Sequence, residues 1–180
     1  MIYLIGGAPR TGKSGLVQQL ITRKPISSLS TDFLYDLDQV RAITNFDKLD
    51  VLKKGEVFFP ILERIIGNIQ RQSENCVIDG DVILPRHADF LSKKYEIRAC
   101  FLGLSEASIE EIIQHGGHFN WPKYKLENGM AKDVEGLVER TIQKSEIIAS
   151  ECVKYDQYYL DLSADFTLGQ ARALRYLLDS

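Results

Sequence analysis

Residues 7–14 have the types and spacing of a phosphate-binding loop. They read Gly-Ala-Pro-Arg-Thr-Gly-Lys-Ser, which fits the P-loop pattern G-x-x-x-x-G-K-[ST]. Gly7 and Gly12 would let backbone N–H groups approach a polyphosphate at a helix N-terminus, which favours anions. The pattern places Lys13 against the β- and γ-phosphates and Ser14 against Mg²⁺. A glycine-rich turn before a helix is the alternative. The residues predicted to bind nucleotide are Gly7, Ala8, Pro9, Arg10, Thr11, Gly12, Lys13, Ser14 and Gly15.

Asp32 is the candidate for chemistry on an acceptor. It comes shortly after residues 26–29, which read as a strand. Phosphoryl transfer to a hydroxyl needs the nucleophile aligned and its proton accepted, and a carboxylate beside the P-loop is suited to both tasks. We therefore predict that Asp32 binds the substrate and acts as the base. The alternative is that Thr31 and Asp32 cap a helix that starts near Phe33.

Asp79 is the candidate metal ligand. It directly follows Val77 and Ile78 in a short apolar strand, where a carboxylate can orient Mg²⁺. An ordinary turn at Asp79-Gly80 is the alternative. Asp81, two residues further on, is predicted to bind the substrate, with a share in the metal site or the end of the turn as alternatives.

Several cations are candidates for binding anionic groups. Arg10 lies inside the P-loop, and Arg41 and Arg86 are predicted to bind an anionic group of the acceptor. Arg140 and Lys144 are four residues apart at one margin of a helical apolar stripe, from which a cation could stabilise the transferring phosphoryl group. For each of these residues the alternative is an ordinary solvated or salt-bridged position.

Apolar strands and amphipathic helices alternate along the chain, as expected for a parallel sheet covered on both faces. With right-handed crossovers, this pattern predicts a three-layer α/β/α domain whose ligand lies at the carboxyl ends of the strands. The predicted strands are residues 2–5, 26–29, 76–78, 97–102 and 158–162.

Helix starts and one irregular segment complete this pattern. Ser105 is predicted to cap a helix, and Thr167 with Gln170 is predicted to form a capping box. Pro60 lies inside a helical apolar period, so it is expected to mark the first turn or to kink the helix. Residues 116–132 have no apolar period and are predicted to be the one long irregular segment.

Length and composition set bounds on the class of protein. The chain has 180 residues, which is long enough for one well-packed domain, so we predict a single domain over residues 1–180. Its hydrophobic fraction of 44% is that of an ordinary globular protein. A net charge of −3 with scattered basic residues argues against a nucleic-acid partner. The sequence contains no apolar run of about 20 residues, the length that a membrane-spanning helix needs, so we expect no membrane partner. Neither a leader peptide nor paired cysteines are suggested, so we expect a cytoplasmic protein whose three cysteines are buried thiols.

Three segments together resemble the small P-loop kinases of metabolites and nucleotides. These are residues 6–14, 30–32 and 77–81. The group includes adenylate, shikimate and gluconate kinases, chloramphenicol phosphotransferase and the 2-phosphoglycerate kinase-like proteins. The resemblance implies a five-stranded parallel sheet of order 2-3-1-4-5, ATP with Mg²⁺, a lid over residues 116–132 and an adenine site near residues 163–165. The lid lacks the paired arginines of adenylate kinases, which leaves Arg140 as the main candidate for a catalytic cation.

The predicted function is ATP-dependent transfer of the γ-phosphoryl group to a small hydroxylated metabolite. The arginines that grip a nucleoside monophosphate are few here, so a nucleoside monophosphate kinase is an alternative rather than the first choice. A nucleotide-binding regulatory protein with little turnover is a second alternative, and a nucleoside triphosphatase is a third. A GTPase is disfavoured, because the chain has no Asn-Lys-x-Asp motif.

Overall fold

The sheet of the computed structural model has five strands in the order β2-β3-β1-β4-β5. The structure describes residues 1–35, 49–72, 74–115 and 121–179. Each pairing of neighbouring strands is parallel, and Ile5 at the centre lies opposite Asp79 and Cys100. The predicted fold class and strand order are therefore confirmed. The strands are β1 (Ile2–Gly7), β2 (Ser27–Ser30), β3 (Cys76–Asp79), β4 (Ile97–Gly103) and β5 (Tyr158–Asp161).

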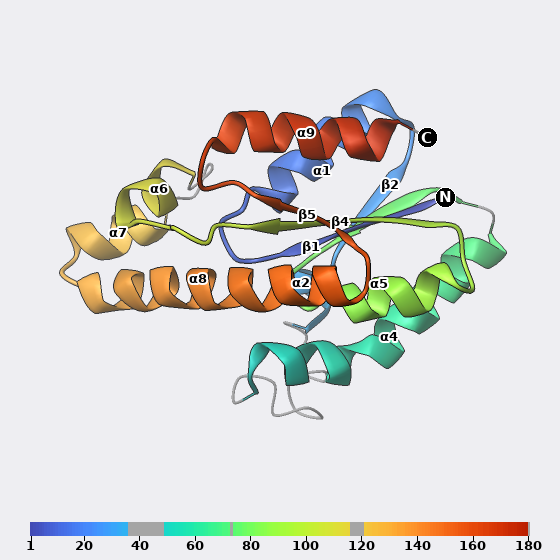
Figure 1. Cartoon of the computed structure of the whole chain (residues 1–180), viewed down its shortest axis with the longest axis horizontal. Coiled ribbons are helices and arrows are strands. Elements are labelled where there is room, and N and C mark those ends of the chain that lie inside the picture. The colour runs from blue at the N-terminus through green and yellow to red at the C-terminus, as the bar shows by residue number, and fades with distance from the viewer. Residues whose placement is uncertain (36–48, 73, 116–120, 180) are drawn as a thin grey trace.

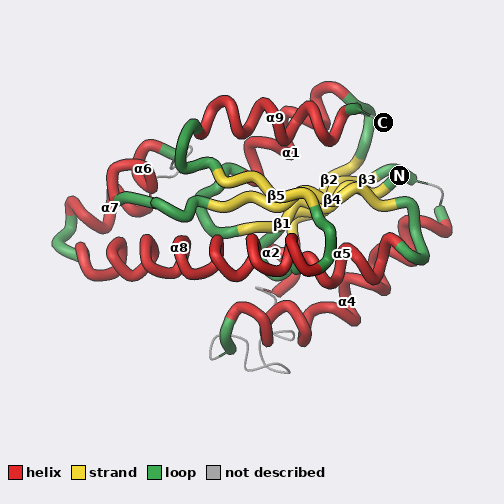
Figure 2. Tube along the Cα trace, in the orientation of Figure 1, coloured by secondary structure: helices red, strands yellow, loops and turns green. Residues whose placement is uncertain are grey.

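Helices cover both faces of the sheet. In Figure 1, α1 and α9 lie above the sheet, while α4, α5 and α8 lie below it. Figure 2 shows the strands as a single layer between these two layers of helices. The bounds are α1 (Lys13–Arg23), α2 (Thr31–Tyr35), α4 (Val51–Arg71), α5 (Pro85–Ser92), α6 (Ile109–Gln114), α7 (Trp121–Glu127), α8 (Ala131–Lys154) and α9 (Phe166–Leu178).

The central strand β1 is buried along its whole length. Its side chains alternate between two apolar cores: Ile2 and Leu4 pack on the side of α4 and α5, and Tyr3 and Ile5 pack on the side of α1 and α9. A strand with both faces covered needs apolar residues at successive positions, which explains the unbroken apolar run at residues 2–5. Burying β1 in this way fixes the P-loop at its carboxyl end.

Helix α8 packs against the end of β4 through a hydroxyl group. Ser145 Oγ accepts a hydrogen bond of 2.8 Å from the backbone N–H of Leu104 and donates one of 2.7 Å to the backbone oxygen of Thr141. The buried residues of α8 follow one another at steps of three or four positions, with two adjacent pairs, as a helix with one inward face requires. They are Val134, Leu137, Thr141, Lys144, Ser145, Ile148, Glu151 and Cys152.

The three cysteines are free thiols in buried positions, as the sequence predicts. Cys76 lies in β3, Cys100 in β4 and Cys152 in α8. Burial raises the pKa of Cys76 and of Cys100, and it raises the pKa of Cys152 to about 12. These side chains therefore behave as small apolar groups rather than as nucleophiles.

Two local predictions about helix starts were wrong. Ser108, not Ser105, caps α6, and it forms a capping box in which its hydroxyl accepts the N–H of Glu111. Asp165, not Thr167, caps α9, and its carboxylate accepts the N–H of Leu168 at 2.9 Å. In both cases a side-chain acceptor lies three residues before the N–H that it binds, which is the usual geometry of an N-cap.

The segment predicted to be irregular contains helix. Within residues 116–132, α7 occupies Trp121–Glu127 and α8 begins at Ala131. The sequence of α7 has no apolar period, so sequence periodicity could not find it. In α4, Pro60 lies in the interior of the helix, so it does not mark the first turn.

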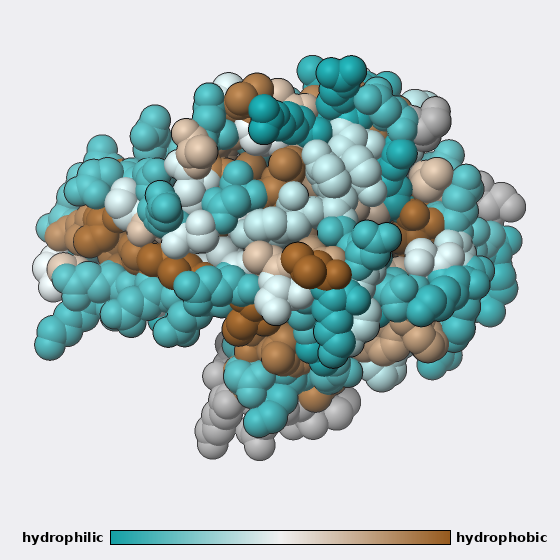
Figure 3. All heavy atoms as spheres, in the orientation of Figure 1, coloured by the Kyte–Doolittle hydropathy of each residue, from teal (hydrophilic) through white to brown (hydrophobic). Residues whose placement is uncertain are grey.

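Most of the surface seen in Figure 3 is hydrophilic, with hydrophobic side chains gathered in a band along α8 below α6 and α7. Within the described residues, no helix combines the length and the apolar character needed to span a bilayer.

Candidate functional site

A cavity of about 520 Å³ opens at the carboxyl ends of the strands. The P-loop, the start of α2, the turn after β3 and the first turns of α9 supply its walls. This is where ligands bind in open parallel sheets, because loops diverge there. The lining residues are Pro9, Arg10, Gly12, Lys13, Ser14, Gly15, Gln19, Asp32, Asp79, Asp81, His115, Phe166 and Gln170.

The P-loop begins with a close contact between β1 and β4. Gly7 has φ +133°, and a Cβ at this position would lie 2.1 Å from the backbone oxygen of Leu102. The next residue, Ala8, donates its N–H to that same oxygen at 2.9 Å. Only glycine fits here, so the first glycine of the motif is required by the packing of the sheet.

Hydrogen bonds from inside and outside the loop fix its shape. The hydroxyl of Thr11 donates to the backbone oxygen of Ala8 at 2.9 Å, and the amide of Gln170 on α9 donates to the backbone oxygen of Thr11 at 2.6 Å. Arg10 adopts the left-handed conformation, with φ 60°. A loop held in this way has its conformation in place before a ligand arrives.

Lys13 is buried and folds back over the loop. Its Nζ atom donates to the backbone oxygen of Ala8 at 2.7 Å and forms an ion pair of 2.7 Å with Asp81 Oδ1. The side chain is 8% exposed. Its ammonium group therefore already has oxygen partners within the site.

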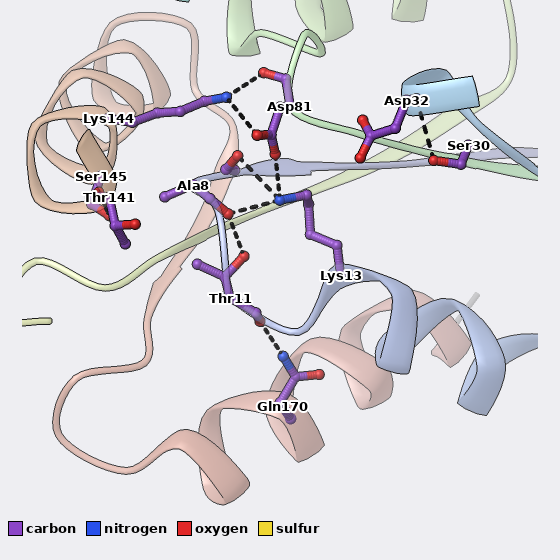
Figure 4. Close-up of polar contacts among 11 residues, drawn as sticks. Ala8, Thr11, Lys13, Ser30, Asp32, Asp81, Thr141, Lys144, Ser145 and Gln170 are labelled. Atoms are coloured by element: carbon purple, nitrogen blue, oxygen red, sulfur yellow. Dashed lines mark hydrogen bonds and ion pairs between the residues drawn. The ribbon is translucent and has the colours of Figure 1, made fainter. Parts of the chain in front are cut away.

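Asp81 lies between two ammonium groups, as Figure 4 shows. Lys144, on α8, donates to the backbone oxygen of Asp81 at 2.5 Å and lies 3.7 Å from Asp81 Oδ2. Burial would raise the pKa of Asp81, but Lys13 and Lys144 together lower it to about 2. Burial lowers the pKa of Lys144 to about 8, against the opposing effect of Asp81. Asp81 is therefore an anion at neutral pH.

Asp79 is a buried carboxylate at the end of β3 and is 6% exposed. Burial raises its pKa to about 6; Lys13 opposes this shift, and Asp32 and Asp81 add to it. A divalent cation would relieve this accumulation of negative charge. Ser14, the other predicted metal ligand, lines the same cavity, so the residues present fit Mg²⁺.

Among the described residues, no group of three or more histidine, cysteine, aspartate or glutamate side chains could hold a metal ion. Mg²⁺ sites that depend on nucleotide take one or two ligands from the protein and the rest from phosphates and water.

Asp32 is exposed and lines the cavity from the first turn of α2. The helix begins at Thr31, and the hydroxyl of Ser30 accepts the N–H of Asp32 at 3.3 Å. The cap in this turn is therefore Ser30, not the Thr31–Asp32 pair.

The turn after β3 brings Asp79 and Asp81 beside Asp32. At its centre Gly80 has φ +152°, and a Cβ there would lie 1.7 Å from Thr31 Oγ1 and 3.2 Å from Asp32 Oδ1. The segments that follow β2 and β3 are therefore in contact, and this contact is possible because Gly80 has no side chain.

Two arginines predicted to belong to the site, Arg86 and Arg140, lie away from the cavity. Arg86 pairs with Glu56 on α4 at 2.9 Å and with Glu151 on α8, so it joins three helices. Arg140 is exposed on α8 and is not among the cavity residues. Arg41 falls outside the described residues. Arg10 does line the cavity.

A second cavity, of about 250 Å³, adjoins the first. Residues 162–167, with Glu111, Gln114 and His115, form its walls, so it includes the segment where the resemblance implies adenine. His115 and Phe166 line both cavities, and their rings stack with centroids 3.5 Å apart. This aromatic pair therefore lies between the phosphate loop and the candidate base site.

Comparison with solved structures gives the fold an independent assignment. The chain is 14% identical to shikimate kinase from Bacteroides thetaiotaomicron, with a TM-score of 0.61 over 100% of this chain and 99% of that one. It is 11% identical to a sugar kinase from Janibacter, with a TM-score of 0.56 over 98% and 93%. The chain has the fold of the small P-loop kinases. The predicted resemblance is thus confirmed at the level of the fold.

An uncharacterised protein from Eubacterium ventriosum shares this fold, with 16% identity and a TM-score of 0.51 over 100% of this chain and 99% of that one. No family model and no curated protein matches the sequence.

Sequence reasoning missed the positions of two site residues, Lys144 and Gln170. From the sequence, Lys144 is expected at the margin of the apolar stripe of its helix. In the structure it is buried on the inward face, three residues after Thr141 and four before Ile148. That spacing was the signal for a buried lysine. Gln170 is expected to belong to a helix cap, and nothing local to its segment indicates that it binds Thr11, 159 positions away.

Proposed function

We propose that this chain is an ATP-dependent phosphotransferase that moves the γ-phosphoryl group to a hydroxyl of a small metabolite. One observation carries the proposal: the P-loop with Lys13 shares a single cavity with Asp32 and Asp79. A protein that only binds nucleotide needs the P-loop, but it has no need of an exposed carboxylate facing the phosphate site. The fold of small-molecule kinases supports the same assignment.

The nucleotide would lie along both cavities. Its triphosphate would follow the P-loop, where backbone N–H groups and the N-terminus of α1 favour anions. Its base would enter the smaller cavity at residues 163–165, beyond the stacked rings of His115 and Phe166. To reach the phosphates, Lys13 would exchange its contacts with Ala8 and Asp81 for phosphate oxygens.

Ser14 and Asp79 would hold Mg²⁺ together with the phosphates. When bound, the ion would neutralise part of the charge on the phosphate oxygens.

Asp32 would do the chemistry on the acceptor. Its carboxylate would accept the proton of the acceptor hydroxyl as that oxygen forms a bond to the γ-phosphorus and the bond from the γ-phosphorus to ADP breaks. The carboxylate is exposed at the rim, so an acceptor can approach it from solvent. Residues 116–132 would act as a lid that excludes water, which would otherwise compete as the acceptor.

The role proposed for Arg140 depends on that closure. In the present structure Arg140 is outside the cavity, so the N-terminal part of α8 would have to approach the phosphates for its guanidinium to act. Turnover in Arg140→Ala tests this role.

The charges of the cavity favour a hydroxylated metabolite over a nucleoside monophosphate as the acceptor. Among the described lining residues, Arg10 and Lys13 are the cations, and both belong to the P-loop. Asp32, Asp79 and Asp81 supply carboxylates to the same cavity. A phosphate on the acceptor calls for arginine side chains that bind it through paired hydrogen bonds, and the described lining offers none besides Arg10 of the P-loop.

The test is conversion of ATP to ADP with Mg²⁺ across hydroxylated metabolites, sugars, nucleosides and nucleoside monophosphates, with mass spectrometry of the acceptor. We expect one acceptor class to raise turnover well above background and to gain one phosphoryl group. Lys13→Ala should abolish this turnover. Demonstrable ATP binding with uniformly slow turnover would instead favour a regulatory protein, and fast turnover without any acceptor would favour a triphosphatase.

A further inference from the structure

We propose that Lys144 is a positioning residue that raises the nucleotide affinity of the P-loop by sharing the carboxylate of Asp81 with Lys13. The inference rests on the proposed function, because it concerns the lysine that would bind the nucleotide phosphates. Lys144 itself is not among the residues that line the cavity, so it would act through Asp81.

The position of Lys144 needs an explanation, because a buried ammonium group is costly unless it is paired. Its side chain is 5% exposed. Its described polar contacts both go to Asp81, 63 residues earlier in the chain: the backbone oxygen at 2.5 Å and the carboxylate Oδ2 at 3.7 Å. An ordinary helix anchor would place an apolar or hydroxyl side chain here, as Thr141 and Ser145 do on the same face.

The same carboxylate holds Lys13 in its observed position. Asp81 Oδ1 lies 2.7 Å from Lys13 Nζ, which also donates to the backbone oxygen of Ala8 at 2.7 Å. An ammonium group has three N–H donors, and the backbone oxygen of Gly7, at 3.4 Å, accepts from the third. An incoming phosphate must therefore compete with Asp81 and the two loop oxygens for Lys13.

Lys144 makes that exchange easier. When Lys13 turns to the phosphates, Asp81 keeps Lys144 as a cationic partner, so its carboxylate is not left unpaired beside other anions. Without Lys144, Asp81 would depend on Lys13 alone and would hold it more firmly. In Figure 4 the two lysines reach Asp81 from different elements, α1 and α8, so one can leave while the other stays.

A double-mutant cycle on ATP binding separates this role from simple anchoring of α8. The dissociation constant of Mg²⁺·ATP would be measured by calorimetry for the wild type, Lys144→Met, Asp81→Asn and the double variant. We expect Lys144→Met to weaken binding about tenfold and Asp81→Asn to tighten it several-fold. In the Asp81→Asn background, Lys144→Met should then have little effect, because the competing carboxylate is gone.

Loss of the backbone contact alone would give a different result. The backbone oxygen of residue 81 is unchanged by Asp81→Asn, so an anchoring role predicts the same loss of affinity from Lys144→Met in both backgrounds. That outcome would overturn the proposal. Lys154→Met, at an exposed lysine at the end of the same helix, is the matched control and should leave the ATP affinity unchanged.

The remaining outcomes are also decisive. If Lys144→Met fails to fold, Asp81→Asn alone still tests the competition, and unchanged or weaker ATP binding in that variant would overturn it. If the wild type binds no Mg²⁺·ATP, the proposed function fails and this inference fails with it. If the wild type binds Mg²⁺·ATP but the cycle is additive, only the inference fails.

Discussion

The side-chain amide of Gln170 donates a hydrogen bond of 2.6 Å to the backbone oxygen of Thr11, so α9 holds the middle of the P-loop. Gln170 is 8% exposed. The contact joins the last helix of the chain to its first loop. Because the conformation of the loop sets the direction of its N–H groups, the last helix helps to determine how the loop would receive phosphate.

We expect Gln170→Leu to weaken Mg²⁺·ATP binding about five- to tenfold and to lower the free energy of unfolding by about 1–3 kcal/mol, because a buried carbonyl loses its donor. Calorimetry and urea unfolding measure these two effects. Gln143→Leu, at an exposed glutamine on α8, is the control. Unchanged ATP affinity in Gln170→Leu would mean that the loop keeps its shape without α9.

Asp32→Asn should lower acceptor-dependent turnover by about 10²–10⁴-fold, because the amide cannot accept the hydroxyl proton. The affinity for Mg²⁺·ATP should stay within a few-fold of the wild-type value, since Asp32 is not part of the P-loop. Steady-state kinetics and calorimetry give the two numbers. Asp156→Asn removes an exposed carboxylate outside the cavity and serves as the control. Turnover of Asp32→Asn close to that of the wild type would exclude Asp32 as the base.

Gly80→Ala should destabilise the protein by at least about 2 kcal/mol, because a Cβ with φ +152° would overlap Thr31 Oγ1. The free energy of unfolding in urea measures this. Gly15 lies in α1, and a Cβ added there would have no neighbouring atoms within 4 Å, so Gly15→Ala should be neutral or slightly stabilising. Equal stability of the two variants would contradict the close contact between the ends of β2 and β3.

The free energy of unfolding should fall as the pH drops from about 6.5 to 4, and protonation of His87 should account for part of this loss. Burial, helped by Arg86, lowers the pKa of His87 from 6.5 to about 4, and Glu56 faces the ring at 3.8 Å. Between these pH values the unfolded chain binds a proton that the folded protein does not, so protonation favours unfolding. The contribution of His87 is present in full above pH 6.5, and about 1–3 kcal/mol is lost by pH 4.

Urea unfolding of the wild type and of His87→Asn at pH 4.5 and pH 7 isolates this contribution, because the other titrating groups are common to both. The variant should be less stable at pH 7, since the ring of His87 stacks on Phe59. It should lose less stability on acidification than the wild type. An equal loss in both proteins would assign the acid sensitivity to carboxylates instead.

Patterns local to one segment predicted most of the fold. The strands follow from apolar runs such as residues 2–5, and the P-loop follows from its glycine spacing. The carboxyl ends of parallel strands lie at one edge of the sheet, so Asp32, which follows β2, and Asp79, which ends β3, are expected beside Lys13. All three residues line one cavity. The roles of these residues remain predictions.

Contacts between distant segments could not be predicted in this way. Arg86 is a candidate for substrate binding on its charge alone, because its partner Glu151 lies 65 residues away on another helix and no local pattern connects the two. The ion pair of Lys144 with Asp81 likewise depends on how α8 packs over the turn after β3. Charge type alone does not distinguish a residue that faces a ligand from one that faces another side chain.

The free thiols of Cys76, Cys100 and Cys152 give the protein its own chemical probes of opening. Each lies in a different element of the interior, and burial holds each thiol in its protonated, unreactive form. An alkylating reagent can therefore label them only when β3, β4 or α8 separates from its neighbours. The order in which the three are labelled would show which part of the sheet yields first, and repeating the labelling with Mg²⁺·ATP would show how far a bound nucleotide slows that separation.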